Sequence, residues 1–185
     1  MRIVGGRFKG RTLSGPSSNA TRPTSDRLRE ALFNVLAHAY GDPADGARVL
    51  DLFAGTGALG LEAISRGAKF AVFVDEATEP RGLIRANVEA LGLGGVTRIF
   101  RRDATKLGTA FASDAFDLVF CDPPYGRGLA VAALTSARDG GWLAPEALIV
   151  VEESVEAAFA APDGFEELER RRYDTSELIF LRAAP

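Results

Sequence analysis

The stretch that decides the fold is Val49-Leu50-Asp51-Leu52-Phe53-Ala54-Gly55-Thr56-Gly57-Ala58-Leu59-Gly60. It begins with an apolar run that is typical of a buried strand, turns through closely spaced glycines and continues into a helical pattern. Glycines are needed where the backbone bends tightly, or where it approaches a ligand with no Cβ in between. The stretch therefore predicts a strand, a ligand-facing turn and a helix in direct succession.

Outward from this stretch, short apolar runs alternate with helical patterns as far as the C-terminus. Strands are expected at 49–52, 70–74, 96–101, 116–121, 147–151, 165–173 and 178–181, and helices at 25–39, from the glycine turn to 65, at 79–91 and at 129–138. This alternation predicts an α/β fold with a mostly parallel sheet and helices on both faces.

Length and composition favour one globular unit with an appended N-terminal segment. The chain has 185 residues, of which 46% are hydrophobic and 25% charged. We expect a basic segment at 1–40, formed by a short hairpin and a helix, packed on a ligand-binding domain at 41–185. One cysteine and one histidine permit neither an internal disulfide nor a zinc site. With no secretory signal pattern and no run of membrane-spanning length, a cytoplasmic protein without membrane contact is expected.

The charge is distributed unevenly. Residues 1–40 carry seven Lys or Arg and two Asp or Glu, for a net charge of +5, whereas the remaining 15 basic and 23 acidic residues give −8. A basic segment on an acidic body is expected where a local surface meets nucleic-acid phosphates. Within this segment we expect Arg7, Lys9, Arg11 and Arg22 to contact RNA phosphates, although a solubilising basic tail would show the same charges.

Acidic residues follow three successive expected strands. Asp51 ends the first strand, Asp75 the second and Asp103 the third, and the carboxyl ends of such strands face the ligand crevice of an open α/β sheet. The glycine spacing also fits a dinucleotide fingerprint. Asp51 favours another ligand, because a carboxylate there would repel a pyrophosphate but suit an ammonium group. S-adenosylmethionine carries that group and no phosphate. Asp75 would accept from its ribose hydroxyls and Asp103 from its adenine amine.

A second motif, Asp122-Pro123-Pro124-Tyr125, follows the apolar run that ends at Cys121. Neither proline can donate to a strand ladder, so the strand ends there and the aspartate is held at its C-terminal end. A carboxylate, fixed carbonyls and an aromatic ring suit a planar base that is held by its exocyclic amine. A turn capped by the aspartate is the structural alternative. Cys121 is expected to pack within the strand, with no histidine to activate it.

These motifs resemble those of the class I S-adenosylmethionine-dependent methyltransferases. More narrowly, the stretches at 2–11, 21–36 and 52–63 are similar to the bacterial 16S ribosomal RNA guanine-N2 methyltransferase family (RsmD type), and the similarity covers essentially the whole chain. The resemblance implies a Rossmann-like, seven-stranded sheet whose last strand is antiparallel. It also implies methylation of a guanine N2 amine in 16S ribosomal RNA, within the 30S subunit or an assembly intermediate.

The resemblance assigns the two groups of residues to two roles. Asp122, Pro123, Pro124 and Tyr125 are the expected catalytic residues. The expected cofactor-binding residues are Asp51, Phe53, Gly55, Gly57, Asp75, Asp103 and Ala104. S-adenosylhomocysteine would be the product, no metal is expected, and a monomer is the default. A DNA, other RNA or protein amino-group methyltransferase stays open, as do a NAD-dependent oxidoreductase and a non-catalytic RNA-binding or assembly factor.

Overall fold

The computed structural model describes residues 1–16, 24–111 and 115–185. In these parts of the chain, seven strands form a sheet of order β3-β2-β1-β4-β5-β7-β6. The strands are β1 (Arg48–Leu52), β2 (Phe70–Val74), β3 (Thr97–Phe100), β4 (Phe116–Cys121), β5 (Leu143–Ser154), β6 (Phe165–Tyr173) and β7 (Ser176–Ala183). Neighbours from β3 to β5 pair in parallel, whereas β7 runs antiparallel to both β5 and β6. The predicted seven-stranded sheet with an antiparallel last strand is confirmed.

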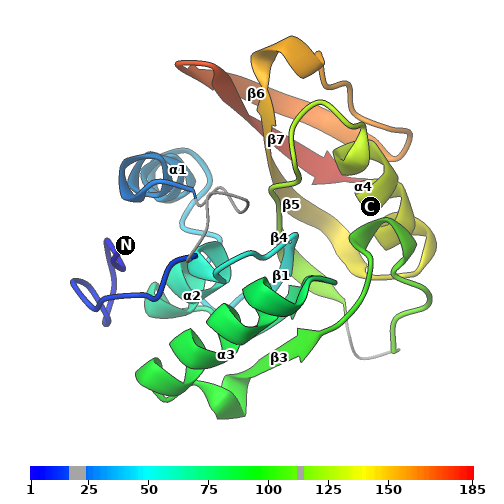
Figure 1. Cartoon of the computed structure of the whole chain (residues 1–185). Coiled ribbons are helices and arrows are strands. Elements are labelled where there is room, and N and C mark those ends of the chain that lie inside the picture. Colours follow the sequence, from blue (N-terminus) through cyan, green and yellow to red (C-terminus); the bar gives the residue numbers. More distant parts are fainter. Residues whose placement is uncertain (17–23, 112–114) are drawn as a thin grey trace.

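In the described residues, four α-helices accompany the strands (Figure 1). They are α1 (Asp26–Ala39), α2 (Ala58–Ser65), α3 (Thr78–Leu91) and α4 (Leu129–Asp139), with short 3-10 turns η1 (Gly94–Val96), η2 (Ala104–Lys106) and η3 (Val155–Ala157). Side chains of α1, α2 and α3 share one apolar cluster with one face of the sheet, and those of α4 share a second cluster with the other face. The sheet is therefore covered on both faces, as its nearly continuous apolar strands require. Among the described residues no helix is long and apolar enough to cross a membrane.

The strand order reverses at β1, which lies between β2 and β4. The chain runs outward through β2 and β3 and then returns to form β4 on the other side of β1. The loops after β1 and β4 therefore leave the sheet in opposite directions and open a crevice at its carboxyl edge. Both decisive motifs of the sequence lie in these two loops.

The N-terminal segment docks on α2. An isolated antiparallel bridge joins Arg2 to Thr12, which is the short hairpin expected from the sequence. The backbone amide of Arg7 donates to the Ser65 carbonyl at 2.9 Å. A Cβ at Gly6, where φ is +75°, would lie 2.0 Å from that oxygen, so only glycine permits this approach. The segment is thereby fixed at the C-terminal end of α2.

A buried ion pair completes this attachment. Arg29 of α1 and Glu62 of α2 are both fully buried, with the Arg29 Nε 3.1 Å from the Glu62 Oε1. The same carboxylate accepts from the backbone amides of Val4 and Gly5 at 3.0 and 2.9 Å, and from Arg66 Nε at 2.9 Å. Removing one partner of such a pair would leave a buried charge uncompensated, at a cost of about 3–5 kcal/mol. Glu62 therefore holds the N-terminal segment, α1 and α2 together.

Candidate active site

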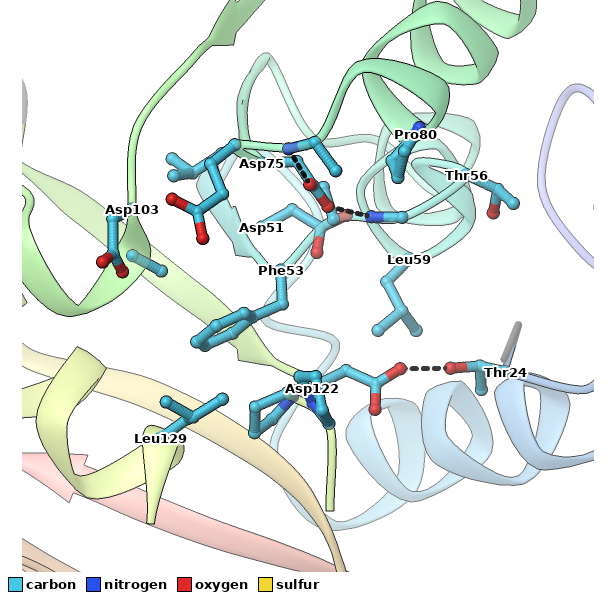
Figure 2. A pocket seen from close by; sticks show the side chains of 18 of the residues that line it. Thr24, Asp51, Phe53, Thr56, Leu59, Asp75, Pro80, Asp103, Asp122 and Leu129 are labelled. Atoms are coloured by element: carbon cyan, nitrogen blue, oxygen red, sulfur yellow. Dashed lines mark hydrogen bonds between the residues drawn. The ribbon is translucent and has the colours of Figure 1, made fainter. Parts of the chain in front are cut away.

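A cavity of about 530 Å³ opens at the carboxyl edge of the sheet (Figure 2). Of the expected catalytic and cofactor residues, all but Gly57 line it. These are Asp51, Phe53, Gly55, Asp75, Asp103, Ala104, Asp122, Pro123, Pro124 and Tyr125. The folded chain thus brings together two motifs that lie about 70 residues apart in the sequence, and the cavity has the size of a small-molecule site.

Asp51 lies at the end of β1 with only 1% of its surface exposed. Its Oδ2 accepts from the Gly60 amide at 3.0 Å. Burial raises the pKa of Asp51 to about 8 despite that hydrogen bond, and the charge of Asp75 acts in the same direction. A cationic group bound beside this carboxyl would favour its ionised form.

The glycines of the turn serve backbone geometry as much as ligand access. Gly57 has φ of +79° and is the N-cap of α2, so it lies outside the cavity lining. A Cβ at Gly60 would lie 2.5 Å from the Phe73 ring and 3.2 Å from the Asp51 carboxylate. Phe53 adopts φ of +57°, a conformation that a non-glycine residue keeps only when its surroundings enforce it. Its ring lies between the Asp75 and Asp122 sides of the cavity (Figure 2).

Asp75 and Asp103 are held by amides close to them in the sequence. The Asp75 carboxylate accepts from Gly55 N at 3.1 Å and from Ala77 N at 3.0 Å, so it links the loop after β1 to the loop after β2. Asp103 caps η2, where its Oδ1 accepts from the amide and hydroxyl of Thr105. Those bonds lower the pKa of Asp103. Asp103 therefore both caps η2 and lines the cavity.

Asp122 is held by a side chain from far away in the sequence. Its Oδ2 accepts from the Thr24 hydroxyl at 2.8 Å (Figure 2). Thr24 also lies 3.2 Å from Glu152 Oε2, and the Tyr125 hydroxyl donates to Glu152 Oε1 at 2.8 Å. Sequence reasoning missed both Thr24 and Glu152. Thr24 stands in a run of potential helix caps, of which Ser25 is the cap of α1, and Glu152 follows the apolar run of β5.

Cys121 takes no part in this network. It is fully buried in β4, within the apolar cluster that faces α4. Burial raises the pKa of this thiol, and the charges of Asp122, Glu153 and Asp51 add to the effect. A thiol in that position is inert, which agrees with its expected packing role.

Of the four residues expected to contact RNA, the three that the structure describes do not line the cavity. Arg7, Lys9 and Arg11 are exposed on the N-terminal segment, and Arg22 lies outside the described residues. The guanidinium of Arg11 donates to the Ala90 carbonyl at 2.8 Å, near the end of α3. The backbone of Arg7 and Phe8 docks at Ser65, the C-terminal end of the eight-residue α2, whereas the cavity lies at the N-terminal end of this helix. About 12 Å of helix therefore lies between this part of the segment and the cavity.

Other charged groups of interest lie elsewhere. On the outer strand β6, Arg170 pairs with Glu167 and Glu177, and Arg171 pairs with Glu169. In the described ranges 1–16, 24–111 and 115–185, no three His, Cys, Asp or Glu residues are grouped as a metal site.

A family of known proteins matches nearly the whole chain. The family described as "Conserved hypothetical protein 95" matches residues 1–182. The chain belongs to this family. "Ribosomal RNA small subunit methyltransferase D" of Escherichia coli K12 is 42% identical over 156 residues, which are 84% of this chain and 76% of that protein. The predicted resemblance is confirmed.

Two further relatives bear on the fold and the chemistry of the family. The solved structure "Putative methyltransferase yhhF from Escherichia coli" superposes with a TM-score of 0.84 at 34% identity, covering 100% of this chain and 98% of that chain. "tRNA (guanine(6)-N2)-methyltransferase" of Thermus thermophilus is 38% identical over 115 residues, 57% of this chain and 33% of that protein. The Rossmann-like methyltransferase fold expected from the sequence is confirmed.

Proposed function

We propose that this protein transfers the methyl group of S-adenosylmethionine to the exocyclic N2 amine of a guanine in the 16S ribosomal RNA. The observation that carries the proposal is the position of Asp122, whose carboxylate shares one cavity with Asp51, Asp75 and Asp103. One side of the cavity is suited to a methyl donor and the other to an amine. Residues 41–185 would form the methyl-transfer domain, and residues 1–40 the RNA-facing segment.

The residues present fit S-adenosylmethionine. Asp51 would receive its ammonium group, Asp75 its ribose hydroxyls and Asp103 its adenine amine, while Phe53 and Ala104 would supply apolar contacts. The buried Asp51 supports the first assignment, because burial withholds water from this carboxyl and a bound cation would compensate its charge. When bound, the cofactor supplies a methyl group that a sulfonium has already activated. No metal is needed for that chemistry.

The residues of the second motif would position the amine. The guanine N2 lone pair is delocalised into the ring, so the amine reacts only when its geometry is imposed. Asp122 and the Pro123 carbonyl would each accept one N–H hydrogen bond, and Tyr125 would stack on the base, contributing about 1–3 kcal/mol. With the amine held in this way, its nitrogen would accept the methyl group, S-adenosylhomocysteine would be left, and Asp122 would receive one N2 proton. Positioning provides most of the acceleration.

The choice of RNA and of guanine is supported by the relatives. The Escherichia coli relative is named for the RNA of the small ribosomal subunit, and the Thermus thermophilus relative for a guanine N2 position in transfer RNA. The basic segment supports a nucleic-acid substrate of either kind. We place the reaction in the cytoplasm, with the monomer acting on the 30S subunit or an assembly intermediate.

The test is incubation of the purified protein with labelled methyl donor and one of three substrates: free 16S RNA, small-subunit particles or DNA. We expect label in the RNA, recovered as N2-methylguanine after digestion. Label in adenine would overturn the choice of base, and label in DNA alone would overturn the choice of substrate. A preference for particles over free RNA would support the ribosomal context.

A further inference from the structure

Hydrogen bonds connect Asp122 to Tyr125 through Thr24, which lines the cavity itself, and through Glu152, which lies behind the cavity wall. Tyr125 donates to Glu152 Oε1 at 2.8 Å, and the Thr24 hydroxyl lies 3.2 Å from Glu152 Oε2 and 2.8 Å from Asp122 Oδ2. Thr24 and Glu152 are 6% and 3% exposed. Glu152 is not part of the cavity lining, so it acts on a ligand only through its neighbours.

The Thr24 hydroxyl carries one proton, and it lies within hydrogen-bond distance of two carboxylates, those of Asp122 and Glu152. A threonine hydroxyl donates one hydrogen bond but accepts others. When Asp122 is ionised, the hydroxyl donates to it. When Asp122 has taken a proton, its carboxyl is a weaker acceptor, and the hydroxyl can turn to Glu152 Oε2 instead. The Thr24 hydroxyl therefore lies where it can donate to either carboxylate.

Glu152 also fixes the aromatic ring. Glu152 lies on β5 directly after Val151, and Val151 pairs with Cys121 of β4. Asp122 directly follows Cys121, so the two carboxylates leave neighbouring strands at the same level of the sheet. A carboxylate on a central strand is a rigid anchor for the phenol. One buried group thus orients the amine acceptor through Thr24 and the stacking ring through the Tyr125 hydroxyl.

We infer that Thr24 and Glu152 are positioning residues of the methyl-transfer site, which hold Asp122 and Tyr125 in the orientation that receives the amine. The inference rests on the proposed function, and it adds two residues that lie outside the motif Asp122-Pro123-Pro124-Tyr125. It also makes the N-terminal segment part of the proposed reaction centre, because Thr24 lies in that segment, two residues before α1 begins at Asp26, and lines the cavity.

The experiment compares kcat, KM for the methyl donor and melting temperature in four single variants and in the double variant of Thr24→Val and Glu152→Gln. Thr24→Val removes the hydroxyl and keeps the shape, and should lower kcat by about tenfold or more while the donor KM stays within about twofold. Thr24→Ser restores the hydroxyl and should recover most of kcat. Ser25→Ala is the matched control: it removes the α1 cap bond to the Leu28 amide, 3.1 Å long, so it should lower the melting temperature and leave kcat unchanged.

Glu152→Gln tests the other end of the chain of hydrogen bonds. Its amide can accept from only one of the two hydroxyls, so kcat should fall several-fold with donor affinity, measured calorimetrically with S-adenosylhomocysteine, unchanged. When Thr24→Val and Glu152→Gln are combined, kcat should fall by less than the product of the two single losses, because both substitutions break the same hydrogen-bond network. If Thr24→Val does not fold, Thr24→Ser and Glu152→Gln decide: normal kcat for Glu152→Gln overturns the inference.

The outcomes separate the two proposals. A wild-type protein that methylates none of the nucleic acids offered would reject the proposed function. An active wild type whose Thr24→Val variant keeps its kcat, or whose Thr24→Ser variant is as slow as Thr24→Val, would reject the positioning role alone.

Discussion

The two sides of the cavity are built in different ways. On the proposed cofactor side, each carboxylate accepts from an amide at most nine residues away in the chain: Asp51 from Gly60, Asp75 from Ala77 and Asp103 from Thr105. On the amine side, Asp122 is held by Thr24, 98 residues away, and Tyr125 by Glu152, 27 residues away.

This difference separates two tasks. Local loops that follow consecutive strands can bind the same ligand in many proteins, because their geometry needs only the strands and their turns. The amine side depends on contacts between the N-terminal segment, β4 and β5, which are free to differ between substrates. Substitutions on the two sides should therefore alter different kinetic constants.

The largest expected effect is on the amine side. Asp122→Ala should lower kcat by roughly a hundredfold to ten-thousandfold, because the amine loses its acceptor, while donor affinity is unchanged. Single-turnover transfer and calorimetry with S-adenosylhomocysteine measure the two quantities. Asp139→Ala, which removes an exposed carboxylate at the end of α4, is the control. Near-normal turnover would remove Asp122 from the mechanism.

On the cofactor side, Asp51→Asn should weaken donor binding by roughly tenfold to a hundredfold, because a charge-assisted hydrogen bond to the donor is removed. In the wild type, donor affinity should rise as the pH approaches about 8, because Asp51 is then increasingly ionised before the donor binds. The variant should lose this dependence. A variant that keeps the same pH profile would show that another group titrates.

Because the pKa of Asp51 is raised in the folded protein, the free energy of unfolding should also depend on pH when no ligand is bound. The folded Asp51 retains its proton up to a pH of about 8, whereas the unfolded one releases it near 3.8. The folded state therefore binds more protons between these values, so this stabilising contribution is present at low pH and is lost as the pH rises to about 8. Denaturant unfolding of wild type and Asp51→Asn should differ by a pH-dependent amount over that window.

A smaller effect is expected from Arg7 and Lys9, because their part of the N-terminal segment docks at the end of α2 that is remote from the cavity. The double variant Arg7→Glu and Lys9→Glu should weaken RNA binding and reduce the salt slope of the affinity by about 1 for each phosphate that is no longer neutralised. Donor affinity should not change. Arg171→Gln, whose arginine is already paired with Glu169 on β6, serves as the control. An equal loss in both variants would mean only a general charge effect.

The smallest effect should come from Tyr125→Phe, which keeps the stacking ring and removes the bond to Glu152. We expect a several-fold loss of kcat and a loss of stability of about 0.5–1.5 kcal/mol. Tyr40→Phe is the matched control, since its hydroxyl donates to Glu169 at 2.7 Å far from the cavity. It should show a comparable stability loss with kcat intact. Equal kcat in both variants would leave the phenol with a structural role only.

The same local and distant contacts explain what the sequence could predict. The strands, the glycine turn and the acids at strand ends follow from periodicity and spacing within short windows, and β2, β4 and β6 were predicted with the observed bounds. Thr24 and Glu152 have no local signature, because their partners are dozens of residues away. A contact of that kind becomes visible only when the strand order is known.

Strand β5 is a second case in which the local sequence pattern does not predict the structure fully. The apolar run predicted 147–151, but the strand spans Leu143–Ser154. The charged residues Glu152 and Glu153 look like a strand end, yet both are buried, and Glu153 accepts from the Gly126 amide at 3.1 Å. Glu152 and Glu153 are buried because Tyr125 and Gly126, in the loop after β4, donate hydrogen bonds to them. The local sequence pattern of β5 does not indicate these partners.

Cys121 can serve as a chemical probe of how often the middle of the sheet opens. It is the only thiol of the chain, fully buried on β4 between β1 and β5. A thiol reagent can modify it only when the middle of the sheet opens, so the labelling rate counts such openings beside the reaction centre. A ligand that binds the folded cavity should slow that rate in proportion to its occupancy. The protein thus carries a natural reporter through which ligands can be screened without a methylation assay.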